Sequence, residues 1–249
     1  MSLYQYRQKI TEVTNAIFTT QAGNIEKAAD LMAECIANKG LVHMFGSGHS
    51  VLPVQDMFPR YGAFPGFHPL MDMRLMWTNV IGSGGAKGLL WLERREGYAQ
   101  VLFENEPIRS GDVMLVYSHG GLNAAGIEVA LEAKKRGLKV VAVTSMCNYK
   151  VREATHSSGK KLADCADVVI DNCCPPEDAL VKIDGWKAPV AASSTVATVT
   201  IAMSLMAQVA DGLAKRGIKP PVFVSPNVPG IPADNTNRVY IEYENSLRR

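Results

Sequence analysis

The side chains best suited to chemistry in this 249-residue chain lie in two short loops rich in glycine and hydrogen-bonding groups. The first loop consists of Gly46, Ser47, Gly48, His49 and Ser50. The second consists of Ser118, His119, Gly120, Gly121, Leu122 and Asn123. Glycines let a ligand approach the backbone, and the N-terminus of a following helix presents unpaired N–H groups and partial positive charge. The combination predicts a cradle for a phosphate group.

Each loop also has a simpler explanation. The second loop lacks the Lys-Ser/Thr ending of a nucleotide P-loop and the three-glycine spacing of a dinucleotide fold, so it could be a plain turn in which Asn123 caps a helix. Two such loops, each directly after an apolar strand, are stronger evidence than one. Ligands of open parallel sheets bind at the carboxyl ends of the strands, so we expect both loops to line one pocket.

The apolar pattern predicts the elements that hold these loops. The expected strands are residues 41–45, 60–69, 113–117, 139–143 and 167–171. The expected helices are two within residues 3–39, one that follows Gly84-Gly85 and extends to Leu102, one over 124–136, and a long apolar one from Ser193 to Gly217. Residues 174–189 are expected to be irregular, and residues 235–249 to form a terminal helix. We expect one domain with N-terminal helices (3–39), a core (40–217) and a C-terminal tail (218–249).

Composition narrows the class of protein. The chain is 47% hydrophobic and 20% charged, which fits a single large core. Its net charge of +2 is too small to indicate a nucleic-acid-binding surface. No apolar run in the sequence is expected to reach the length of a membrane span, and the polar N-terminus does not resemble a signal peptide. The adjacent Cys173 and Cys174 are expected to be buried thiols. We therefore expect a cytoplasmic enzyme that requires no metal or other cofactor.

The two loops, together with the segment from Lys161 to Ile170, resemble the SIS (sugar isomerase) domain over about residues 25–215. The resemblance implies a flavodoxin-like α/β fold, a three-layer α/β/α sandwich with a five-stranded parallel sheet. It also implies that the ligand is a phosphorylated sugar, that the reaction is aldose–ketose isomerisation, and that the chain forms a homodimer or larger homo-oligomer. The usual second loop reads Ser-x-Ser-Gly-x-Ser/Thr. Here His119-Gly120 replaces the usual Asn/Thr-Ser, which removes one phosphate-binding hydroxyl and adds an imidazole.

Isomerisation needs a group that removes a proton next to a carbonyl. The candidates are Glu93, Glu96, His68, His49 and His119. The positions of Glu93 and Glu96 resemble the Glu-x-x-Glu helix of N-acetylmuramic acid 6-phosphate etherases, although glutamates beside arginines also indicate a solvated helix face.

Further comparison with known families leaves the acid/base residue open. His68 lies in a segment similar to arabinose-phosphate isomerases, where a His-Pro pair follows the strand, but it could be an ordinary loop histidine. Phosphoheptose isomerases carry a catalytic glutamate where Arg60 stands here, which counts against that particular reaction.

Hydroxyls at the start of the long apolar helix could complete the phosphate site or simply cap the helix. They belong to Ser193, Ser194 and Thr195. Two alternatives to isomerisation stay open. An etherase-like lyase would share the first step, since proton abstraction next to a carbonyl also starts an elimination. A non-catalytic phosphosugar sensor is the other, although no DNA-binding head is predicted.

Overall fold

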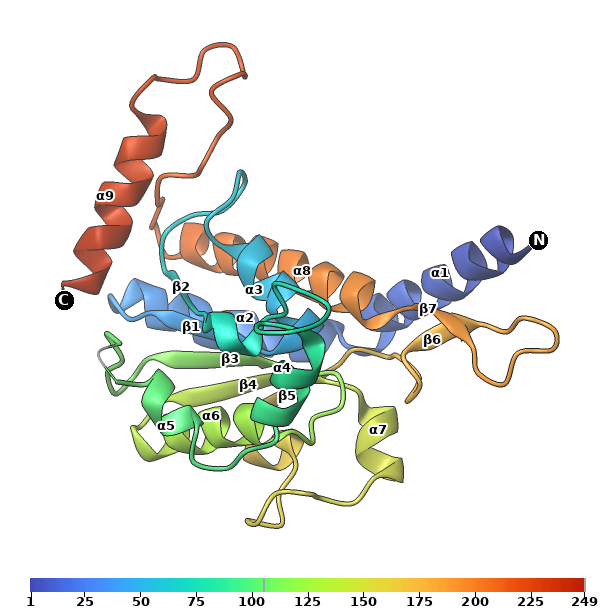
Figure 1. Ribbon diagram of the computed structural model, residues 1–249. Coiled ribbons are helices and arrows are strands. Elements are labelled where there is room, and N and C mark those ends of the chain that lie inside the picture. Colours follow the sequence, from blue (N-terminus) through green and yellow to red (C-terminus); the bar gives the residue numbers. More distant parts are fainter. Residues whose placement is uncertain (105, 249) are drawn as a thin grey trace.

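The computed structural model describes residues 1–104 and 106–248 and is built around a five-stranded parallel sheet (Figure 1). The strand order is β2-β1-β3-β4-β5, and every neighbouring pair is parallel. The strands are β1 (Val42–Gly46), β2 (Phe67–Leu70), β3 (Val113–Tyr117), β4 (Lys139–Thr144) and β5 (Val168–Asp171). This confirms the predicted sheet. The apolar runs predicted it because a parallel strand covered on both faces needs apolar side chains on both.

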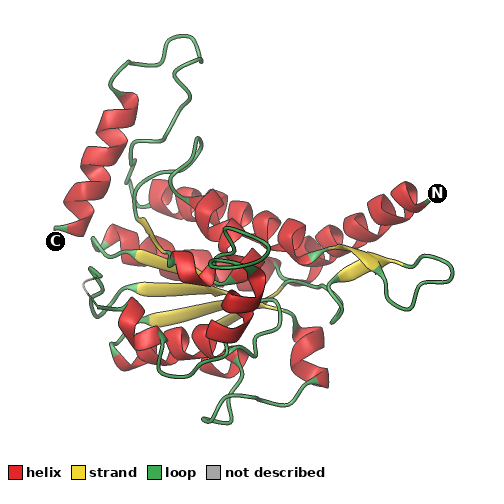
Figure 2. Cartoon of the chain, in the orientation of Figure 1, coloured by secondary structure: helices red, strands yellow, loops and turns green. Residues whose placement is uncertain are grey.

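Helices form a layer on each face of the sheet, as Figure 2 shows. Val42 and Met44 of β1 share one core with α2 and α8, whereas Phe45, the next residue, belongs to the core under α5 and α6, as the alternation of a strand requires. The first face is covered by α2 (Ala22–Ala37), α3 (Val51–Met57) and α8 (Ser194–Lys215), with α1 (Ser2–Thr20) extending beyond it. The second face is covered by α4 (Ala86–Leu92), α5 (Ala99–Leu102) and α6 (Ala124–Lys135).

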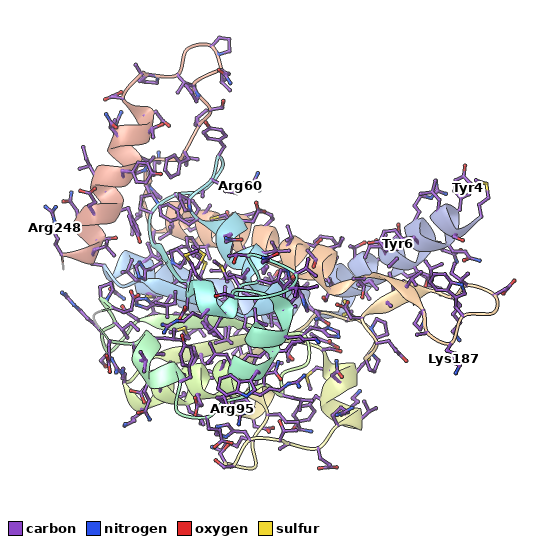
Figure 3. All side chains as sticks on the ribbon, viewed as in Figure 1. Tyr4, Tyr6, Arg60, Arg95, Lys187 and Arg248 are labelled. Atoms are coloured by element: carbon purple, nitrogen blue, oxygen red, sulfur yellow. The ribbon has the colours of Figure 1, made fainter. Side chains whose placement is uncertain are left out.

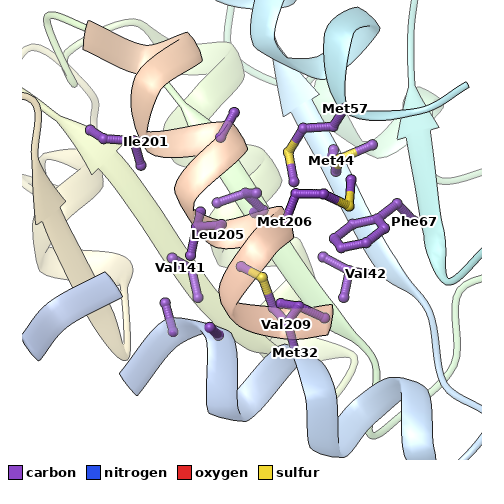
Figure 4. Close-up of a cluster of buried hydrophobic side chains, with 14 of the residues drawn as sticks. Met32, Val42, Met44, Met57, Phe67, Val141, Ile201, Leu205, Met206 and Val209 are labelled. Carbon is purple, nitrogen blue, oxygen red and sulfur yellow. The ribbon is translucent and has the colours of Figure 1, made fainter. Parts of the chain in front are cut away.

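The apolar helix α8 lies at the centre of the first core. Figure 4 shows Leu205 and Val209 of α8 packed beside Met32 of α2 and against the sheet residue Val141, all of them buried. Contrary to the expectation that no apolar run reaches a membrane span, α8 is long and apolar enough to cross one by length and composition, but half of its most apolar 18-residue stretch is buried inside the fold. The methionines that fill this core are Met32, Met44, Met57 and Met206. They occupy irregular gaps between helix and sheet, as their flexible side chains allow.

Three short elements differ from the sequence prediction. The helix expected to reach Leu102 is two helices, because the chain turns between α4 and α5, where Gly97 has φ of 90°. The stretch expected to be irregular contains an antiparallel hairpin of β6 (Ala179–Val181) and β7 (Val190–Ala192). The second strand, expected over residues 60–69, begins only at Phe67; it still includes His68, which is therefore not a loop histidine.

The remaining segments connect or flank the sheet. Three 3-10 turns, η1 (Gly48–Ser50), η2 (Met73–Leu75) and η3 (Leu162–Cys165), and helix α7 (Met146–Val151) lie between the main elements. The predicted terminal helix is α9 (Asn235–Leu247), which stands at one side of the sheet (Figure 1). All five cysteines are free thiols, with Cys174 buried and Cys173 half-buried.

Candidate functional site

The two predicted loops leave the sheet side by side. Gly46, the last residue of β1, is paired in register with Tyr117, the last residue of β3. The chain turns into the first loop directly after Gly46 and into the second directly after Tyr117. Because both strands run in the same direction, both loops lie at the carboxyl edge of the sheet. The predicted convergence of the two loops is therefore present in the structure.

Three glycines are required by the shape of these loops. A Cβ at Gly46 would lie 2.0 Å from the carbonyl oxygen of Ser50, so the first loop closes only around glycine. Gly48 and Gly121 have φ of 58° and 63°, in the left-handed region that favours glycine. A Cβ at Gly121 would also lie 2.6 Å from Thr144 Oγ1. The loops thus depend on glycine for their course, whether or not a ligand is present.

Glu93 is the acid/base candidate that lies between the two loops. It follows the last residue of α4, is only 5% exposed, and accepts a 2.7 Å hydrogen bond from Ser47 Oγ of the first loop. Its backbone carbonyl accepts from the N–H of Ala125, in the first turn of α6 after the second loop. Burial raises the pKa of Glu93 above its usual value, and the Ser47 hydrogen bond and the charge of Arg94 only partly offset this. The carboxyl group therefore lies in surroundings that favour its protonated form more than water does.

A second polar group lies on the side of the first loop that faces α8. His49 Nε2 lies 3.1 Å from Ser194 Oγ, and that hydroxyl donates to Asp178 Oδ2 at 2.6 Å. Asp178 Oδ1 accepts from the backbone N–H groups of Ser193 and Ser194 and from the Ser193 hydroxyl. Burial opposes ionisation of Asp178, but the hydrogen bonds from Ser194 outweigh it and hold the pKa of this carboxyl below its usual value. The Ser193 and Ser194 hydroxyls thus fix an ionised aspartate beside His49.

Sequence reasoning missed Asp178. It lies in a turn just before β6, with φ of 50°, in a stretch expected to be irregular. An aspartate tolerates this left-handed conformation better than most residues. That tolerance is the one local signal by which the Pro-Pro-Glu-Asp sequence indicates a turn. Nothing nearby in sequence identifies its partners, since His49 is more than a hundred residues away.

His119 in the second loop is buried, and both of its ring nitrogens have partners. Nδ1 lies 3.2 Å from the amide of Asn172, and Nε2 lies 3.1 Å from the amide of Asn148. Both neighbouring atoms are amide nitrogens, and a neutral imidazole has one nitrogen that accepts, so one asparagine NH₂ group donates to the ring. Burial lowers the pKa of His119, which keeps it neutral. The residue that departs from the usual loop pattern ties the loop to α7 and to the end of β5.

Two acid/base candidates lie away from this group. His68 in β2 is opposite His43, and its nitrogens lie 2.7 Å from Tyr243 Oη of α9 and 2.8 Å from Glu106 Oε2. Glu96 follows the end of α4 and is hydrogen-bonded to the backbone and hydroxyl of Ser157. Of the five candidates, the structure thus brings Glu93, His49 and His119 to the carboxyl edge.

The remaining cradle residues are ordered by the loops themselves. Ser118 Oγ accepts from the N–H of Gly121, while Ser50 and Ser194 are buried. Asn123 precedes α6, but its side chain makes no capping hydrogen bond. Its amide is therefore not used as the helix cap that the simpler explanation of this loop required.

Comparison with known proteins identifies the family. The sequence model of the SIS domain matches residues 5–145 of this chain. The chain belongs to the SIS domain family. It is 36% identical over 238 residues to a UPF0309 protein of Geobacillus kaustophilus, which covers 96% of this chain and 92% of that protein. A UPF0309 protein of Thermoanaerobacter pseudethanolicus is also 36% identical, with 94% of each chain covered.

Solved SIS-type structures confirm the fold. A phosphoheptose isomerase from Neisseria gonorrhoeae superposes with a TM-score of 0.56 at 18% identity, over 84% of this chain and 97% of that one. A phosphoheptose isomerase from Francisella tularensis gives a TM-score of 0.54 at 19% identity, over 84% and 96% of the two chains. This SIS chain therefore has the three-layer fold predicted from its sequence.

Proposed function

We propose that this SIS protein binds a phosphorylated sugar and interconverts its aldose and ketose forms, with Glu93 as the group that moves the proton. The observation that carries the proposal is the Glu93 carboxyl, buried between the two Gly/Ser loops, bonded to Ser47 and raised in pKa. The SIS family membership and the names of the two superposed isomerases support a phosphosugar as the ligand.

In this proposal the loops anchor the phosphate and Glu93 works on the carbons next to the carbonyl. A phosphate between Ser47 and Asn123 would receive backbone N–H groups from the start of α6 and hydroxyl donors from the loops. The Glu93 carboxylate would take a proton from one carbon, and the resulting acid would return it to the neighbouring carbon. A raised pKa suits both halves of this cycle, because the group must hold the proton and release it.

The histidines then have unequal roles. His49 is half-exposed and is held by Ser194 beside the ionised Asp178, so it is placed to carry a proton between the two oxygen atoms of the enediol intermediate. Both nitrogens of His119 face asparagine side chains within the protein, so we assign this residue the task of holding the second loop. The Ser193 and Ser194 hydroxyls act through Asp178, and do not contact the ligand directly.

The ligand is tested by thermal unfolding with a panel of sugar phosphates, each beside its unphosphorylated sugar. A ligand of the folded state at about 100 times its Kd raises stability by roughly 2.7 kcal/mol. We expect stabilisation by one or more phosphorylated members and by none of the free sugars. The Ser118→Ala and Asn123→Ala variants should lose this stabilisation. Equal stabilisation by free sugars, or unchanged affinity in both variants, would contradict the phosphate cradle.

The reaction class is tested by NMR of the stabilising sugar phosphate in D₂O. An isomerase gives the partner sugar phosphate, with deuterium incorporated at the carbon next to the carbonyl. An etherase-like lyase would release the substituent beside that carbon, and a sensor would bind with neither change. The turn after α4 separates the two residues of the Glu-x-x-Glu pattern, which counts against the etherase-like lyase.

We also propose that the protein acts as a homo-oligomer. Helix α1 and the β6–β7 hairpin extend together from one side of the body, with Tyr6 Oη bonded to the carbonyl of Ala192 (Figure 3). Large apolar side chains on these elements are exposed, among them Leu3, Tyr4, Phe18 and Trp186. Such a group is typical of an association surface. Light scattering coupled to gel filtration should give a mass at least twice 27.0 kDa.

A further inference from the structure

Three side chains that are far apart in sequence meet on the α6 side of the sheet. Glu96 comes from the turn between α4 and α5, Glu128 from α6, and His156 from the loop after α7. One ligand atom from each lies within 4.8 Å of the other two. His156 Nε2 lies 3.8 Å from Glu96 Oε2 and 3.7 Å from Glu128 Oε1. These separations are too long for hydrogen bonds, so the three groups face one another across a small gap.

His156 is the unusual member of this group. Its side chain is only 6% exposed, and among the described residues its Nε2 atom has no hydrogen-bond partner. A buried polar atom is rarely left without a partner in a folded protein. The other nitrogen, Nδ1, lies 2.8 Å from Ser158 Oγ and accepts from the backbone N–H of Ser158 at 3.1 Å. The neutral ring therefore carries its proton on Nε2, which points toward the two carboxylates. A metal ion at Nε2 takes the place of this proton, with the ring proton moved to Nδ1 and donated to the Ser158 hydroxyl.

We propose that Glu96, Glu128 and His156 bind a divalent metal ion of the Zn²⁺ or Mn²⁺ type. Imidazole nitrogen and carboxylate oxygen are the ligands these ions take, and two carboxylates balance the charge of the ion. Three ligands at about 2.1 Å around a tetrahedral ion lie about 3.4 Å from one another. The 3.7 and 3.8 Å separations seen from His156 therefore close around an ion with a shift of a few tenths of an ångström.

The groups behind the ligands are already in place. Glu128 Oε1 accepts from the N–H of Gly97 at 2.6 Å, and Oε2 accepts from the N–H of Ala99 at 3.3 Å. Glu96 accepts from the N–H and the hydroxyl of Ser157, next to His156. Hydrogen bonds of this kind orient metal ligands and limit what must be ordered on binding. They are what distinguishes this group from a chance cluster of surface carboxylates.

A cavity of about 540 Å³ gives access to the proposed metal. Glu96 and His156 line it together with Arg94, Arg152 and the residues 122–124 at the end of the second loop. An ion can enter from this cavity and keep a water molecule in its open coordination position. The metal would join the loop after α7 to α6 and to the turn that follows Glu93. Metal binding can be measured without any sugar, so the outcome of that test is independent of the proposed isomerase activity.

The test is a titration of the full chain with Zn²⁺ and with Mn²⁺ after treatment with EDTA. We expect calorimetry to show one site per chain, and the midpoint of thermal unfolding to rise with the metal and fall again with EDTA. Co²⁺ should give visible absorption bands of a nitrogen- and oxygen-ligated ion. Affinity should fall at least tenfold in His156→Ala, in Glu128→Gln and in Glu96→Gln.

Glu132→Gln is the matched control, since Glu132 lies one turn further along α6 and pairs with Arg136 at 2.9 Å outside the proposed site. It should bind metal like the wild-type chain. If His156→Ala fails to fold, as judged by circular dichroism, the two glutamine variants decide the result, because they retain the shape of the side chain and one of its two oxygen acceptors. The proposal is overturned if no metal binds at millimolar concentration, or if binding persists unchanged in the variants.

Discussion

Replacement of Glu93 by glutamine tests the proposed chemistry and the buried carboxyl together. Glutamine has nearly the same shape and keeps an oxygen that can accept from Ser47 Oγ, but it can neither take up nor release a proton. Loss of a general acid/base group costs about 10²–10⁴ in rate, which corresponds to about 2.7–5.4 kcal/mol of transition-state stabilisation. Turnover and deuterium exchange should fall by this factor, while affinity for the stabilising sugar phosphate stays within a few fold.

The same substitution should increase stability above acidic pH. Burial raises the pKa of Glu93, so the folded protein binds this proton more tightly than the unfolded chain does. The contribution of this proton to the free energy of unfolding is fully present below the pKa of Glu93 in the unfolded chain, near 4.3, and is lost as pH rises through its pKa in the folded protein. Each unit between the unfolded and the folded pKa corresponds to about 1.4 kcal/mol. Glu93→Gln avoids this loss, so its advantage over wild type should be absent near pH 4 and largest at pH 8.

Two measurements can refute this reasoning. Urea unfolding at pH 4 and pH 8 should show the wild-type chain losing more stability than Glu93→Gln over this interval; parallel curves would mean that the carboxyl is not held in a raised-pKa state. Unchanged turnover in Glu93→Gln would remove Glu93 from the reaction. Glu104→Gln, a change at an exposed carboxylate, serves as the control and should leave both turnover and pH dependence unaltered.

Two further substitutions test the groups around Glu93. Asp178→Asn replaces an oxygen acceptor by a donor that faces serine donors, so urea unfolding should show a loss of about 1.5–3 kcal/mol at pH 7. Because the pKa of Asp178 is lowered, the wild-type chain loses this stability as pH falls through the folded pKa. The difference in unfolding free energy between wild type and Asp178→Asn should therefore shrink at pH 3. An equal difference at pH 7 and pH 3 would show that the charge is not involved. Gly121→Ala combines positive φ with a contact to Thr144 and should lower stability by about 1–3 kcal/mol, or the Tm by about 2–4 °C per kcal/mol. Gly120→Ala, which meets open space, should keep the wild-type Tm, and similar losses in both variants would contradict the steric explanation.

The sheet and the loop positions were predictable because both have strong local signatures. Residues 113–117 are apolar throughout, which suits a strand covered on both faces, and Gly121 follows where the chain needs a left-handed turn. Gly46 similarly marks a loop that closes too tightly for any side chain. Such features depend on a few neighbouring residues and on general sterics, so the sequence expresses them directly.

The hairpin and the aspartate before it could not be predicted in the same way. Strands β6 and β7 are three residues each and, within the described part of the chain, pair with one another; their apolar runs, Ala-Leu-Val and Val-Ala-Ala, are too short to indicate a strand. Asp178 acquires its role from Ser194 and His49, which reach it only through the tertiary fold. A carboxylate with long-range partners leaves no local pattern, and a single sequence therefore does not reveal it.

The Glu-x-x-Glu pattern shows most clearly what the fold adds. In an uninterrupted helix, residues three apart lie on the same face, so Glu93 and Glu96 would share one environment. The helix instead ends at Leu92, and the backbone turns at Gly97. Glu93 is left buried against Ser47, while Glu96 faces Ser157 and His156. One turn of chain thus separates a carboxyl group suited to proton transfer from one suited to a cation, and the two substitutions, Glu93→Gln and Glu96→Gln, should affect different measurements.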